Sequence, residues 1–209
     1  MLQILFGSLL LSVVHALIPN HWIPLVAIGK AEKWSKRETI SATIITGLAH
    51  TSSTVLVGIA IGFAGYKLSA SYDLITTLIA PLVLVTIGLV YLIIDFVKLH
   101  RHEHSFVARA SGLSKSRWGL ILTLSIAMFF SPCIELEAFF FQAGTLGWPG
   151  IIVVSVIYTI TTVTFMAVFV SLGTRGIEKL NWHFLEHHEK RVTGLVLIIL
   201  GILVYFVRF

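Results

Sequence analysis

Six long apolar stretches constrain the fold of this chain more than any other feature of its sequence. They cover approximately residues 2–29, 39–63, 74–97, 118–143, 149–173 and 192–208. Most of them reach about 20 residues or more, the length that an α-helix needs to cross ~30 Å of hydrocarbon. Only 12% of the residues are charged, whereas soluble domains carry about 25%. The sequence therefore predicts an all-α, polytopic membrane protein with six transmembrane helices, forming one domain over residues 1–209.

The Lys and Arg residues lie almost entirely in alternate connections between these stretches. Thirteen of the 15 fall in the first, third and fifth connections: Lys30, Lys33, Lys36, Arg37, Lys98, Arg101, Arg109, Lys115, Arg117, Arg175, Lys179, Lys190 and Arg191. The positive-inside rule places these connections in the cytoplasm and both termini outside. The net charge of +5 then reflects orientation in the cytoplasmic membrane, and no nucleic-acid partner is expected.

Three helices in each half mean that the two halves enter the membrane from opposite sides. This topology is expected of two inverted three-helix repeats, a common architecture of secondary transporters. Each half opens with a proline-interrupted stretch, at Pro19 and at Pro132, although membrane helices tolerate proline for other reasons. The predicted parts are repeat one at about 1–97, a His-rich cytoplasmic loop at about 98–117, and repeat two at about 118–209.

Three histidines fall within the first two stretches. Pro19 would free the backbone carbonyl of His15, and a kink there would bring His15 towards His21, which is about 120° away on a regular helix. His50 lies roughly 16 Å into its helix, where an ionisable group without a partner costs at least about 2.5 kcal/mol. We interpret all three as metal ligands. The alternatives are an interfacial position beside Trp22 for His21, and a hydrogen bond to a nearby Ser or Thr for His50.

The fourth stretch carries a second polar group, around Pro132. Glu135 and Glu137 would face nearly opposite sides of an intact helix, so either the helix unwinds near Pro132 or only one carboxylate faces the pathway. Both are predicted metal ligands, and Glu135 is the stronger candidate because it is nearer the break. Cys133, the only cysteine, is either a soft ligand or a small buried hydrophobic residue.

These residue types indicate the class of metal. Imidazole suits nickel, cobalt, zinc and iron, whereas magnesium and calcium prefer shells made of oxygen. The sequence does not distinguish among the four transition metals. The third connection adds an accessory candidate, because short His-rich tracts can bind metal. Its members are His100, His102 and His104, for which a solvated loop without a ligand is an equal alternative.

The same motifs resemble those of a known family. The segment from His15 to His21, His-Ala-Leu-Ile-Pro-Asn-His, is similar to the first-helix signature of the NicO-type nickel/cobalt transporters, which belong to a LysE-like superfamily. Gly-Leu-Ala-His-Thr around His50 is similar to that family's second-helix motif, and Ser-Pro-Cys at 131–133 to its proline-cysteine break. The family often has an acidic residue in the first motif, where this chain has Ile18 and Asn20, and a less acidic stretch after the break. The resemblance implies a divalent cation transporter, often an exporter.

Two functions are therefore compared below. The leading hypothesis is a transporter of a divalent transition-metal ion, with the metal as substrate, working by alternating access around an intramembrane His/Glu site. The second is a membrane-embedded metalloenzyme that uses the same cluster. A thiol relay is disfavoured because it needs a second cysteine. Gly58 and Gly62 form a small-residue pair that packs helices either within one subunit or in a homo-oligomer.

Overall fold

The computed structural model of the chain describes residues 2–18, 21–67, 78–97 and 116–174, together with parts of 191–206. The described residues are helical, contain no strand, and confirm the all-α class. The named elements are α1 (Leu2–Leu17), α2 (Ile23–Ala31), α3 (Lys36–Lys67), α5 (Ala80–Val97), α7 (Arg117–Phe129), the 3₁₀ turn η4 (Ile134–Leu136), α8 (Glu137–Gly144) and α9 (Trp148–Gly173).

The apolar stretches correspond to helices of two kinds. The second and fifth stretches are the uninterrupted helices α3 and α9. The first stretch is divided into α1 and α2, and the fourth into α7, η4 and α8. The third stretch is helical from Ala80, and only parts of the sixth are described. The broken stretches are those that contain Pro19 and Pro132, whereas Pro81 and Pro149 lie in the first turns of α5 and α9 and interrupt neither helix.

Helices α3 and α7 are each capped at the N-terminus by side chains. Ser35 and Glu38 form a capping box, in which the Ser35 N–H donates to Glu38 Oε2 and the Glu38 N–H donates to Ser35 Oγ. Ser116 caps α7 by accepting a hydrogen bond from the Gly119 N–H. An ion pair between Arg117 and Glu38 joins the two starts. This exposed pair links the N-terminal ends of α3 and α7.

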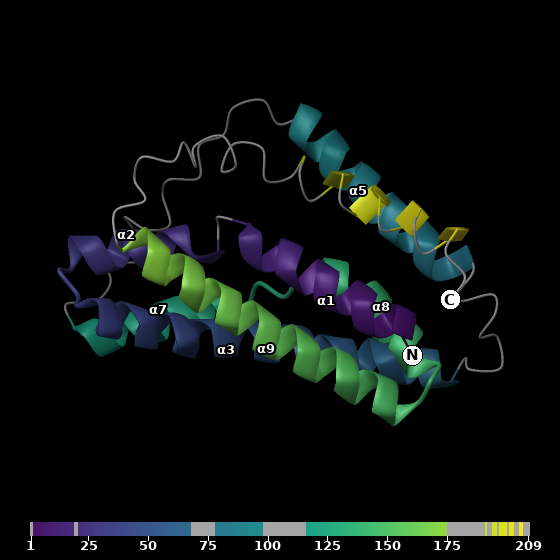
Figure 1. Cartoon of the computed structure of the whole chain (residues 1–209), viewed down its shortest axis with the longest axis horizontal. Coiled ribbons are helices and arrows are strands. Elements are labelled where there is room, and N and C mark those ends of the chain that lie inside the picture. Colours follow the sequence, from purple (N-terminus) through teal and green to yellow (C-terminus); the bar gives the residue numbers. More distant parts are fainter. Residues whose placement is uncertain are drawn as a thin grey trace.

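Helix α3 lies at the centre of the bundle. It packs against α7, α8 and α9. Helix α1 also packs against α9 (Figure 1). A methyl group at Gly58 would overlap the Phe140 ring, and one at Gly62 would contact Ile151. The glycine pair therefore packs helices within this chain, which is one of the two roles that the sequence allowed.

Both the interior and the surface of this bundle carry large apolar side chains, and the interior also holds polar ones. Buried Ser and Thr side chains follow the inner faces of α1 and α3: Ser8, Ser12, Thr39, Thr43, Thr46, Thr51 and Thr54. Large apolar side chains such as Leu56, Leu122 and Ile160 are exposed. Helices α3 and α9 are each long and apolar enough to cross a bilayer, and only 39% and 33% of their most apolar windows are buried. Six spans, the inverted repeat and the orientation of the termini stay predictions.

Candidate metal centre

The break between α1 and α2 positions two of the predicted ligands. His15 lies in the last turn of α1, and its carbonyl accepts a hydrogen bond from the Ile18 N–H at 3.1 Å. The His21 N–H then donates to the Ile18 carbonyl at 3.3 Å. Pro19 and Asn20 lie outside the described residues. Across this break the His15 and His21 rings, six residues apart in the sequence, lie in contact.

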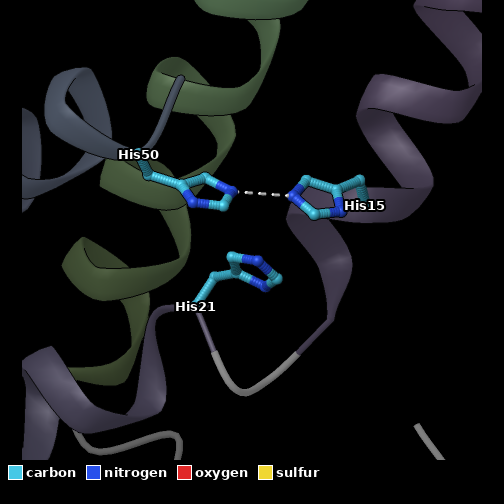
Figure 2. A group of neighbouring side chains, drawn as sticks. All are labelled: His15, His21 and His50. Carbon is cyan, nitrogen blue, oxygen red and sulfur yellow. Dashed lines mark hydrogen bonds between the residues drawn. The ribbon is translucent and has the colours of Figure 1, made fainter. Parts of the chain in front are cut away.

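His15, His21 and His50 form a compact group of imidazoles (Figure 2). The ring centroids of His15 and His21 are 4.3 Å apart, those of His21 and His50 are 5.0 Å apart, and those of His15 and His50 are 5.4 Å apart. Each residue offers one ring nitrogen within 4.8 Å of the others. His15 and His50 are buried. The Nδ1 atom of His21 is also buried, and in the described part of the chain it makes no hydrogen bond.

The orientation of His50 is set by the end of α7. His50 Nδ1 lies 3.3 Å from the Met128 carbonyl oxygen. A carbonyl only accepts, so Nδ1 carries the proton and donates it, which leaves a lone pair on His50 Nε2. A backbone carbonyl that fixes the tautomer of a histidine in this way is typical of metal ligands. The free lone pair points at His15 Nε2, 3.1 Å away.

This 3.1 Å separation suits a shared proton or a shared ion. In the first case the His15 Nε2–H donates to His50 Nε2. In the second, a transition-metal ion bound at about 2.0–2.1 Å from each nitrogen would subtend an angle of about 100°. That angle lies between the values of octahedral and tetrahedral coordination. The two facing nitrogens are therefore already spaced as a pair of ligands.

A second group extends from the other face of His15. Cys133 Sγ lies 3.4 Å from His15 Nδ1, and its thiol donates to Glu135 Oε2 at 2.8 Å. All three side chains are buried, and their ligand atoms lie within 4.8 Å of one another. Cys133 and Glu135 come from the non-helical segment and the η4 turn that separate α7 from α8. Breaks in two distant stretches thus supply ligand atoms to one place.

Two further side chains support the group and were not anticipated from the sequence. The Tyr158 hydroxyl of α9 lies 3.4 Å from His50 Nε2 and donates to Thr54 Oγ1 at 3.3 Å. Thr54 Oγ1 also accepts from the Cys133 N–H at 3.0 Å and donates to the His50 carbonyl. Thr54 follows His50 by one helical turn, a spacing that could have indicated it. Tyr158 has no such signal.

Glu137 and the loop histidines stand apart from these groups. Glu137 is the first residue of α8 and is buried, but it belongs to neither ligand group. Neither of its carboxylate oxygens has a hydrogen-bond partner among the described residues. His100, His102 and His104 lie outside the described residues. Their predicted accessory role, like that of Glu137 as a ligand, stays a prediction.

Fold and site together define an all-helical protein with a buried His/Cys/Glu cluster suited to a transition metal. Among known proteins, the chain is similar to a urease accessory protein, UreH, of Bacillus sp. (strain TB-90). The two are 29% identical over 105 residues, which are 50% of this chain and 45% of that protein. The chain thus matches less than half the length of this relative. No family model matches the chain, and no solved structure matches it.

Proposed function

We propose that this protein is a multi-pass membrane transporter of a divalent transition-metal ion, acting as an exporter of nickel or cobalt. The observation that carries the proposal is the convergence of His15, His21 and His50, with a buried and unpartnered nitrogen on His21. Burying a polar atom without a hydrogen-bond partner costs about 1–3 kcal/mol. A bound ion would satisfy all three imidazoles.

The surface supports a location in the membrane. Contiguous apolar side chains on exposed helix faces are unfavourable in water and favourable against lipid. Less than half of the most apolar segment of α3 and of α9 is buried. The core helix of a soluble protein would be mostly buried. The polar side chains instead face inward, where they line the elements that carry the histidines.

The ligands come from both predicted repeats, which suggests how transport would work. His15, His21 and His50 belong to the first predicted repeat, whereas Cys133 and Glu135 belong to the second. Rocking of one repeat against the other would expose the ion alternately to the two sides of the membrane. Because the ligands must be neutral imidazole or deprotonated carboxylate, protons would compete with the ion and could serve as its counter-ion.

The comparisons agree with this proposal in part. A relative named as a urease accessory protein is 29% identical to this chain over a region that covers half of it. Membership of the NicO-type family, which the motifs resemble, belongs to the proposal. Within the group nickel, cobalt, zinc and iron, the donor set alone selects no single ion.

The test is net metal flux in proteoliposomes that contain the full chain. Ni²⁺ or Co²⁺ is supplied on one side, and accumulation is followed with an enclosed metal-sensitive dye. We expect flux with the wild type, none above empty vesicles with His15→Ala, and wild-type flux with the control Ser12→Ala, which changes a buried side chain one turn earlier on α1. An enzyme that used the same cluster would bind metal without net flux, and that result would refute the proposal in favour of the second hypothesis.

A further inference from the structure

His15 belongs to both ligand groups, and it uses a different nitrogen in each. Its Nε2 faces His50, and its Nδ1 faces Cys133. The two groups therefore lie on opposite edges of one imidazole ring. The three-histidine group offers nitrogen only, whereas the other group mixes nitrogen, sulfur and oxygen.

A neutral imidazole has one lone pair and one N–H, and these lie on different nitrogens. When His15 binds an ion through Nε2, its Nδ1 carries the proton and offers nothing to an ion beside Cys133. When it binds through Nδ1, the reverse holds. Binding of an ion at both nitrogens at once would require the neutral ring to lose its remaining N–H proton, which is unfavourable near neutral pH.

We infer that the protein holds two mutually exclusive metal subsites, joined by His15, and that a single ion passes from the first to the second when His15 Nδ1 loses its proton to water and Nε2 takes one proton up from water. The first subsite consists of His15, His21 and His50, and the second of His15, Cys133 and Glu135. The inference rests on the proposed transport function and deepens it. It adds a thiolate-containing site that would take borderline or soft divalent ions such as Ni²⁺, Co²⁺ or Zn²⁺.

The distances around Cys133 fit this role. An ion about 2.3 Å from sulfur and about 2.0–2.1 Å from nitrogen would subtend an angle of about 100° at the observed Sγ–Nδ1 separation of 3.4 Å. The Sγ–Oε2 separation of 2.8 Å is shorter than the about 3.6 Å expected of two such ligands in a tetrahedral site. A thiol proton now holds these atoms together. Metal binding breaks the S–H bond and releases one proton to water, the sulfur lone pair goes to the ion, and the carboxylate moves outward.

Co²⁺ is a suitable probe, because a thiolate ligand gives it a charge-transfer absorption that imidazole and carboxylate do not. Purified full-length protein in detergent is titrated with Co²⁺, and both bound ion and absorption are measured. The variants are Cys133→Ser, which removes the second subsite, and His50→Ala and His21→Ala, which each damage the first from a different element. Ser12→Ala is the control, and circular dichroism with gel filtration establishes folding.

We expect one Co²⁺ per chain at saturation in the wild type, in Cys133→Ser and in at least one folded first-subsite variant. The thiolate absorption should be partial in the wild type, absent in Cys133→Ser, and at least two-fold larger per bound ion in His50→Ala or His21→Ala. Two ions per wild-type chain, or no thiolate absorption in any folded first-subsite variant, would overturn the inference and leave transport intact. A wild-type protein that binds no Co²⁺ would overturn the proposed function as well.

Discussion

Replacing His15 with alanine should weaken metal binding more than any other single substitution in this chain. His15 is the one residue shared by both ligand groups, so its loss removes a ligand from each and leaves no intact alternative. Four-ligand structural zinc sites bind with about 10–16 kcal/mol, or about 2.5–4 kcal/mol for each ligand. Since about 1.4 kcal/mol corresponds to a factor of ten, His15→Ala should weaken Ni²⁺ or Co²⁺ binding by about 100- to 1000-fold.

Equilibrium dialysis of the purified protein against buffered free metal measures this loss directly. Ser12→Ala is the matched control, because Ser12 is buried on the same helix and hydrogen-bonds only to the Ser8 carbonyl in the described part of the chain. The control should bind metal as the wild type does. A His15→Ala protein that is folded and binds within threefold of the wild type would refute the reasoning, because the imidazole could then not be a ligand in either group.

Four other outcomes follow from the same contacts. Tyr158→Phe removes the hydroxyl that donates to Thr54 Oγ1, which in turn holds the Cys133 N–H and the His50 carbonyl, and should weaken Co²⁺ binding about 10-fold in dialysis, as loss of outer-shell partners does. Glu137→Gln should leave bound-metal stoichiometry unchanged by elemental analysis, because this carboxylate lies in neither ligand group; a lost ion would instead make it the ligand that the sequence predicts. Gly58→Ala should destabilise the fold by about 1–3 kcal/mol through overpacking, seen as a lower Tm, whereas Gly47→Ala, whose added methyl makes only ordinary contacts, should not. Glu38 lies outside the predicted span at 39–63, and hydrogen bonds within the capping box hold the pKa of its carboxyl below the usual value. Glu38→Gln should therefore lower Tm at neutral pH. The difference in Tm between variant and wild type should vanish as the pH falls below about 4, where the carboxyl becomes protonated.

The sequence predicts helices well here because their signals are local. Length and apolar composition are enough to identify α3 and α9. Proline away from a helix start indicates the interruptions of the first and fourth stretches, whereas Pro81 and Pro149 lie in the first turns of α5 and α9. The bounds of the interruptions are less accessible. The fourth stretch reads as one span over 118–143, but α7 ends at Phe129 and α8 begins at Glu137, because the intervening backbone finds partners on α3 that no local pattern encodes.

Part of the candidate site could be predicted from the sequence, again because the signal lies in single residues. His15, His50 and Glu135 are conspicuous from sequence because an ionisable group is costly at membrane depth. Their division into two groups is not, since it depends on which nitrogen of His15 faces which neighbour. The supporting role of Tyr158 requires the packing of α9 against α3, a contact between helices that lie far apart in the sequence.

The helix breaks explain why the ligands meet where they do. The last carbonyls of a helix lack intrahelical partners, and α7 ends early enough to leave the Met128 carbonyl for the Ser131 N–H and for His50 Nδ1. The same interruption frees the Cys133 N–H, which binds Thr54 one turn beyond His50. The break in the fourth stretch therefore provides a backbone carbonyl that orients His50 on α3, as well as the Cys133 and Glu135 side chains that would bind the ion. A continuous helix in the fourth stretch would use the Met128 carbonyl for its own backbone, so the interruption near Pro132 is what offers this carbonyl to His50 Nδ1 and leaves the lone pair on Nε2, facing His15.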